Sequence, residues 1–233
     1  GRAVYSFCMC PGGTVVAATS EPNRVVTNGM SQYSRNERNA NAGMVVGIDP
    51  RDYPQDAQAF ETHLGQTYGV EALPAGQFHP LSGSVLQRQL ESNAFVLGGR
   101  DYSAPGQLVG EFIAGKPSTQ LGSVEPSYKP GVALGDLHAA LPGYAIEALR
   151  EALPVFGRKI KGFDMHDAVL TGVETRTSSP LKIGRGENLQ SLNTPGLYPA
   201  GEGASYAGGI LSAGVDGIKV GEAVARSLLG AAT

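Results

Sequence analysis

The feature that most constrains the fold is a glycine-rich turn between a short apolar stretch and a long amphipathic pattern near the carboxyl end. Residues 197–200 predict a short buried strand, which must end at once because Pro199 has no backbone N–H to donate. Gly201 and Gly203 then allow a tight turn that brings the backbone close to a ligand. From residue 209 to 229 apolar residues recur at helical spacing. We therefore expect a helix whose first N–H groups face an anionic or electron-rich ligand.

Four stretches of the sequence resemble one family. The run GLYPAGEGASYAGGILSAGVDGIKVGEAVA is similar to the closing flavin-contacting strand, turn and helix of two-dinucleotide-fold FAD-dependent oxidoreductases. It is closest to the group called FAD-dependent, or NAD-utilising, dehydrogenases. YSFCMCPGGTVVAATSE, VVTNGMSQYSRNERNANAGMVV and GVETRTSSPLKIGR agree with that group. The resemblance implies that FAD is contacted by Gly201, Glu202 and Gly203 near its diphosphate and ribityl, and by Gly208, Gly209 and Ile210 near the flavin ring.

The amino-terminal fingerprint of such flavoproteins is absent from the sequence. GxGxxG, which would hold the adenosine diphosphate after a first strand, occurs nowhere. We therefore expect this chain to be the carboxyl-terminal part of a longer enzyme. Its missing amino-terminal half would supply the rest of the FAD site, so the fragment alone is expected to bind FAD weakly and to be inactive.

The rest of the chain predicts an α+β fold. We expect a mixed, mostly antiparallel sheet with flanking helices, joined to the closing strand and helix of a Rossmann-type FAD-binding domain. The 33 glycines and 15 prolines favour many turns and short strands. We assign residues 1–170 to an inserted substrate-binding domain and residues 171–233 to the carboxyl-terminal part of the FAD-binding domain. Strands are predicted at 3–7, 14–19, 24–27, 44–48, 168–177 and 180–183, helices at 52–66, from 85 and at 142–153, and a loop at 98–116.

Two cysteines and one histidine are the candidate catalytic residues. Cys8 and Cys10 would share one face of a strand. They could form a strained disulfide, pass electrons to a flavin or supply a thiolate, or they could be two buried apolar thiols. His79 lies in a predicted loop, where it could act as a general acid or base or be structural.

Arg176 is the candidate for substrate binding. Its planar guanidinium suits a carboxylate or a phosphate, and the family resemblance places its strand at the border between the two domains. A simple ion pair with Glu174 explains the same residues equally well.

Composition argues against several other classes. The net charge is −3 with no long basic run, which speaks against nucleic-acid binding. No apolar stretch reaches the roughly 18 residues of a membrane span. The four histidines have no metal-ligand spacing, so no metal is expected, and no motif supports hydrolysis. A cytoplasmic location is the default expectation.

Two functions remain. The first is an FAD-dependent oxidoreductase, a dehydrogenase that transfers hydride between flavin and an unidentified small-molecule substrate, with NAD(P) as a candidate partner. The alternative is an independently folded substrate- or partner-binding module without enzymatic activity. The sequence identifies neither the substrate nor the oligomeric state.

Overall fold

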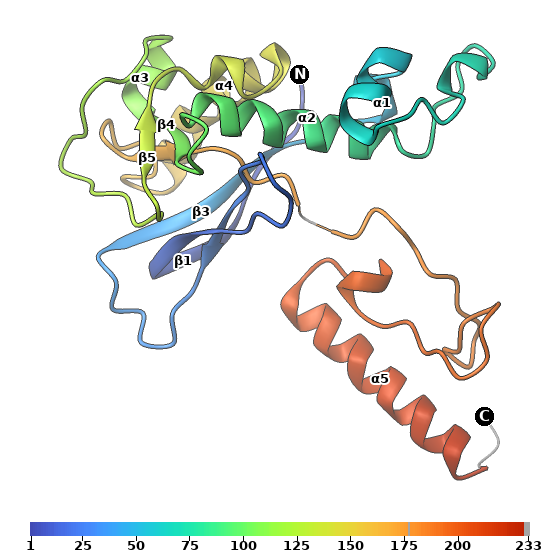
Figure 1. The fold of residues 1–233 in the computed structure, drawn as a ribbon. Helices are drawn as coiled ribbons and strands as arrows, with labels where there is room; N and C mark the ends of the chain where they lie inside the picture. The colour runs from blue at the N-terminus through green and yellow to red at the C-terminus, as the bar shows by residue number, and fades with distance from the viewer. Residues whose placement is uncertain (177, 231–233) are drawn as a thin grey trace. The chain divides into compact units, whose positions relative to one another are not determined.

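The computed structural model describes residues 1–176 and 178–230, which divide into two compact units (Figure 1). Unit 1 runs from Gly1 to Thr175, and unit 2 begins at Arg176. Two small sheets, one antiparallel and one mixed, lie in unit 1 with flanking helices. The predicted α+β class is confirmed.

The first sheet is antiparallel, with strand order β2-β1-β3. β1 spans Val4–Ala17, β2 Thr27–Met30 and β3 Asn39–Val46. β1 pairs with β3 along most of its length and with β2 through its last four residues. The prediction of separate strands at 3–7 and 14–19 was wrong, because β1 spans both. The register shifts on both sides of Cys10, so bulges absorb the glycines within one long strand.

The second sheet has strand order β5-β4-β6. β4 (Ala104–Leu108) is buried throughout, and it pairs in parallel with β5 (Val132–Leu134) and antiparallel with β6 (Val169–Thr171). The predicted loop at 98–116 was wrong, because β4 and helix α3 (Val109–Ala114) lie within it. A side chain at Gly106 would overlap Val132, so this glycine allows the close strand approach rather than marking a turn.

The helices of unit 1 also differ from their predicted bounds. α1 spans Ala57–Leu64 and starts after Asp56, whose carboxylate accepts the Ala59 N–H at 2.8 Å as an N-cap. α4 spans Gly143–Lys159 and contains Pro154, which was predicted to end it. The proline removes one backbone hydrogen bond, while burial of Leu149 and Leu153 on the same helix favours continuation. The remaining elements of unit 1 are α2 (Ser82–Leu97) and short 3₁₀ turns at Pro50–Asp52, Val70–Ala72 and Leu137–Ala139.

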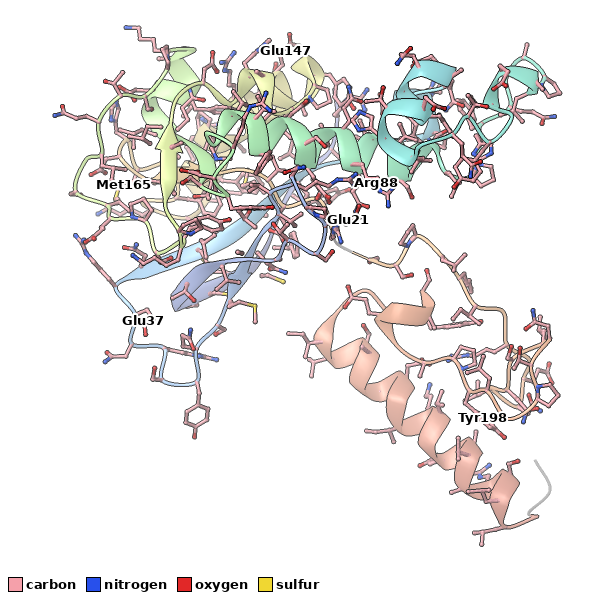
Figure 2. All side chains as sticks on the ribbon, viewed as in Figure 1. Glu21, Glu37, Arg88, Glu147, Met165 and Tyr198 are labelled. Carbon is pink, nitrogen blue, oxygen red and sulfur yellow. The ribbon has the colours of Figure 1, made fainter. Side chains whose placement is uncertain are left out.

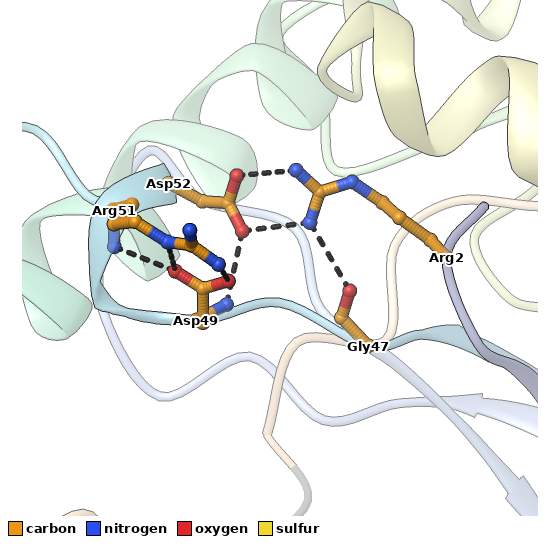
Figure 3. Close-up of polar contacts among 5 residues, drawn as sticks. All are labelled: Arg2, Gly47, Asp49, Arg51 and Asp52. Atoms are coloured by element: carbon orange, nitrogen blue, oxygen red, sulfur yellow. Dashed lines mark hydrogen bonds and ion pairs between the residues drawn. The ribbon is translucent and has the colours of Figure 1, made fainter.

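A polar network ties the amino terminus to the first 3₁₀ turn (Figure 3). Arg2 donates to both carboxylate oxygens of Asp52 at 2.7 and 2.5 Å, and to the Gly47 carbonyl at 3.3 Å. Asp49 accepts from the Arg51 side chain at 2.9 and 2.8 Å. These guanidinium groups hold the pKa values of both carboxyls below their usual range. The network therefore links the amino terminus to the segment that precedes α1.

The described part of unit 2 contains one long helix and one short 3₁₀ turn. α5 spans Ile210–Leu228, close to the predicted bounds, and η4 covers Glu202–Ala204. Residues 197–200 and 180–183 form no strand in the described part of the chain, against prediction. The strand predicted at 168–177 is reduced to β6, and Thr177 lies outside the described residues. Pro199 lacks an N–H, and the described part of unit 2 has no strand to pair with.

Candidate functional site

Unit 1 encloses a cavity of about 620 Å³, a volume within the range typical of small-molecule sites, about 300–1,000 Å³. All three strands of the first sheet contribute to its lining, as do α3, α4 and β6. Met165, on the segment before β6, also lines it and is labelled in Figure 2. Most of the lining is apolar and includes Val15, Met44, Phe112, Leu149, Leu153, Phe163 and Leu170.

The segment 123–128 closes one wall of this cavity. The Val15 N–H donates to Ser127 Oγ at 2.9 Å, which fixes the segment on β1. On the other side the Asn39 amide donates to the Glu125 carbonyl at 2.7 Å, and Arg38 donates to the Ser123 carbonyl at 2.7 Å. Ser123 also donates to Asp167, and the Tyr128 hydroxyl donates to the Tyr102 carbonyl at 3.1 Å, so hydrogen bonds from several segments hold this wall.

Asn41 of β3 places an amide against the sheet beside the cavity. Both of its polar side-chain atoms are buried, and neither has a hydrogen-bond partner among the described residues. The amide lies over Gly29 of β2, where a side chain would overlap its oxygen, and close to Gly13 of β1. Two glycines thus make room for a buried amide that costs stability while it is unpaired.

Glu174 is the acidic residue of the cavity lining. Its carboxyl is half-buried, and burial raises its pKa. The described residues form no hydrogen bond or ion pair with it. Gly43 leaves space beside it, since a methyl group built there would lie 3.1 Å from Glu174 Oε2 and 2.7 Å from the Phe7 ring. An accessible carboxyl in an apolar cavity can bind a donor or exchange a proton.

The two cysteines do not share a face. Cys8 is exposed with a φ of 51°, whereas Cys10 is buried, and both are free thiols. The Cys10 thiol donates to the Cys8 carbonyl at 3.1 Å. Desolvation, followed by Cys10 and Glu174, raises the pKa of the Cys8 thiol. This environment disfavours the thiolate, so a nucleophilic Cys8 gains no support from it.

His79 packs in a second, smaller cluster of unit 1. Its ring stands edge-on to Phe60 with centroids 5.0 Å apart, and its Nδ1 accepts the Leu81 N–H at 3.1 Å before α2. It is not among the residues that line the cavity. These contacts fix a loop, and a catalytic role for His79 stays a prediction.

In unit 2 a bidentate ion pair holds the predicted cofactor turn against α5. Arg185 donates to both oxygens of Asp216 at 2.9 and 2.6 Å, and one of these oxygens also accepts the Gly201 N–H at 2.8 Å. Arg185 further bonds the Pro199 carbonyl at 2.7 Å, and its guanidinium lies 3.6 Å from the centroid of the Tyr206 ring. Hydrogen bonds from Arg185 and Gly201 lower the pKa of Asp216 to about 2.

The predicted cofactor residues lie at the surface of unit 2. Gly201 has a φ of 65°, which a side chain would strain, and a side chain at Gly203 would meet no atom within 4 Å. Glu202, Gly208, Gly209 and Ile210 are exposed, and Gly209 is the N-cap of α5. The turn and the start of the helix are therefore at the surface, where the Gly209 N–H donates to Ser212 Oγ at 3.2 Å. Contact of these residues with FAD stays a prediction.

Arg176 is the first residue of unit 2, and Glu174 belongs to unit 1. Arg176 and its expected ion-pair partner Glu174 therefore belong to different units. The segment before it is fixed within unit 1: Gln87 donates to the Thr175 carbonyl at 3.0 Å, and the Thr175 hydroxyl donates to Glu91 at 2.8 Å. Substrate binding by Arg176 stays a prediction.

Sequence reasoning missed Asn41, Arg185 and Asp216, and it considered Glu174 only as a partner of Arg176. The alternation of asparagine with alanine in NANAG could have indicated a polar face at Asn41 on a strand. Asp216 is one of four charged side chains in the helix pattern, with Lys219, Glu222 and Arg226, so the sequence alone does not mark it for a partner. No local pattern pairs it with Arg185, which lies 31 residues away.

Two negative findings concern the described residues alone. They contain no group of three or more histidine, cysteine or acidic side chains that could hold a metal ion. Among them no helix is both long and apolar enough to cross a membrane.

Comparison with known proteins gives two matches. Residues 1–177 match the family described as FAD-dependent protein, C-terminal domain-like. An uncharacterised protein of Clostridium beijerinckii is 49% identical over 221 residues, which are 95% of this chain and 37% of that protein. The chain thus spans little more than a third of the length of this relative.

Proposed function

Because the chain belongs to the family of FAD-dependent proteins, C-terminal domain-like, we propose that it is the substrate-binding part of an FAD-dependent oxidoreductase. In the intact protein, hydride would pass between the flavin and a small-molecule substrate. The observation that carries the substrate-binding part of this proposal is the cavity of about 620 Å³ in unit 1, with its apolar lining and the carboxyl of Glu174, and the flavin part rests on the family match. Such a cavity suits substrate binding more than structural packing.

The proposed roles divide between the two units. Unit 1 binds the substrate body and excludes water from it. Unit 2 contacts FAD through Gly201, Glu202 and Gly203 and through the start of α5 at Gly208, Gly209 and Ile210. The exposed glycines and the N–H groups of the first helical turn would suit a diphosphate or an electron-rich ring edge. FAD, when bound, supplies the hydride acceptor or donor.

We propose that the partner of unit 2 is the amino-terminal FAD-binding part of a longer polypeptide, with unit 2 as the end of a Rossmann-type domain. The apolar side chains of α5 support this, since Ile210 is 91% exposed and Leu211 is 86% exposed. Ile218 and Leu228, further along the helix, are 67% and 82% exposed. An apolar helix face of this size needs a cover. The greater length of the Clostridium relative provides room for such a domain.

The test is made with the longer polypeptide and with the 233-residue chain side by side. The longer protein should purify with a visible flavin spectrum. Added FAD should raise its melting temperature, since binding at 100 times the Kd stabilises the folded state by about 2.7 kcal/mol. The shorter chain should show little of either effect. A colourless longer protein that FAD does not stabilise would contradict the proposal.

The second candidate function is a binding module without activity. The cavity alone supports it equally well, because apolar ligands bind without redox chemistry. Reduction of the bound flavin by a substrate under anaerobic conditions separates the two functions. The same assay with NADH or NADPH decides whether NAD(P) is a partner.

We also propose that the intact protein acts in the cytoplasm.

A further inference from the structure

We propose that the cavity of unit 1 binds an apolar amine, with the protonated nitrogen held by Glu174 and the hydrocarbon body in the apolar interior. This inference rests on the proposed function only in treating the bound amine as a substrate, since amine binding itself can be measured without FAD. It names a chemical class that neither the family nor the relative specifies.

The position of Glu174 is the first argument. Its carboxyl belongs to the lining, is half-buried, and makes no hydrogen bond or ion pair with the described residues. Carboxylates that leave bulk water normally have a partner, because desolvating an unpaired charge is costly. Gly43 beside it lacks the side chain that would crowd Oε2. The structure therefore leaves the carboxyl reachable from the cavity.

The remaining charges of the lining are the second argument. Lys161 and Arg38 also line the cavity, and both are exposed. Arg38 is engaged by the Ser123 carbonyl at 2.7 Å and by Glu125 at 3.7 Å. A ligand carboxylate would meet only these exposed cations, whereas a ligand ammonium would meet a half-buried acceptor. Charge-assisted hydrogen bonds strengthen as water is excluded, so the ammonium is favoured.

The interior chemistry is the third argument. Phe112 and Leu153 are 1% and 2% exposed, and they belong to both the core and the cavity lining. Such surfaces accept flat or branched hydrocarbon and no second charge. The ligand that matches both parts has one cationic end and an apolar remainder.

The experiment uses three naphthyl probes that differ only at the polar end: 2-naphthylmethylamine, 2-naphthylmethanol and 2-naphthoate. The chain has no tryptophan, so naphthyl fluorescence can be followed directly. At neutral pH the 233-residue chain should bind the amine about tenfold more tightly than the alcohol, and the carboxylate most weakly. Amine binding should weaken in acid as Glu174 is protonated. The Cys8 thiol, whose pKa Glu174 helps to raise, is a titratable neighbour.

Two variants test the assignment. Glu174→Gln keeps the shape of the side chain and should bind amine and alcohol with equal affinity, while its binding of the alcohol stays within about twofold. Glu147→Gln, on the exposed part of α4 and outside the cavity lining, is the matched control and should keep the preference (Figure 2). Thermal melting of each variant confirms that it is folded, and Glu174→Asp provides a second variant if the first melts early.

Several outcomes would overturn the inference. They are equal binding of amine and alcohol by the unchanged chain, tightest binding of 2-naphthoate, or a preference that survives in Glu174→Gln. None of these depends on flavin. A colourless longer protein would contradict the oxidoreductase proposal and leave the amine measurement standing, so the two failures can be told apart.

Discussion

Unit 1 and unit 2 treat their apolar residues in opposite ways. Unit 1 buries Val25, Phe112, Ile146 and their neighbours in the larger of its two core clusters, and part of that cluster also lines the cavity. In α5 of unit 2 only Val220 is buried, although the helix is strongly amphipathic in sequence. Unit 1 therefore buries most of its apolar side chains within itself, whereas unit 2 leaves the apolar side chains of α5 exposed. Periodicity alone indicates an apolar helix face but not which surface covers it.

The largest expected effect contrasts one buried and one exposed apolar side chain. Phe112→Ala in the core should destabilise unit 1 by about 3–5 kcal/mol, because it removes a 1%-exposed ring and leaves a void. Leu211→Ala on α5 should change the stability of the 233-residue chain by less than about 0.5 kcal/mol. Urea unfolding followed by circular dichroism measures both. A large loss for Leu211→Ala would mean that this chain itself covers α5.

The next effect concerns the ion pair inside unit 2. Arg185→Ala leaves the mostly buried Asp216 carboxylate without its bidentate partner and should cost about 2 kcal/mol. The pKa of Asp216 is lowered to about 2, so the stabilisation is fully present above pH 4 and is lost as the pH falls towards 2. Thermal melts between pH 7 and 2 should converge for the variant and the unchanged chain. Parallel curves would contradict this role of the pair.

A smaller gain is expected at the buried amide of unit 1. Asn41→Leu replaces two unpaired polar atoms by hydrocarbon of similar size and should stabilise the chain by about 1 kcal/mol. Gly29→Ala should instead destabilise the chain, because the added methyl group would overlap the Asn41 amide oxygen. Chemical denaturation distinguishes the two signs. Destabilisation by Asn41→Leu would show that the amide is paired in solution.

The smallest effect is a pH dependence at Glu174. Burial raises the pKa of this carboxyl, so the folded state favours its protonated form. The resulting stability is present below the pKa of the unfolded chain and is lost as the pH rises through the raised folded value. Glu174→Gln should therefore melt slightly higher than the unchanged chain at pH 7 and equally at pH 4. A lower melting temperature at pH 7 would indicate a favourable partner for the carboxylate.

Sequence analysis predicted correctly the elements that depend on the spacing of neighbouring residues. The helix at 209–229 and the α+β class are confirmed, since apolar spacing over 19 residues leaves little ambiguity. β4 was mistaken for a loop because Pro105 and Gly106 read as turn residues, while the buried strand position depends on distant partners Val132 and Thr171. The cavity could not be predicted for the same reason: its walls come from strands, helices and loops far apart in sequence.

The bulged middle of β1 has a consequence for how the strand tolerates changes in length. Its early residues are aligned with β3 from Val4↔Val46 to Phe7↔Gly43, and its late residues are aligned with β2 from Thr14↔Met30 to Ala17↔Thr27. Register shifts between Phe7, Cys10 and Gly13 separate the two alignments. In a regular strand, one residue gained or lost would turn every later side chain to the opposite face. Here an inserted residue can be accommodated in the bulged middle of β1, while the pairing with β3 at one end and with β2 at the other keeps its register.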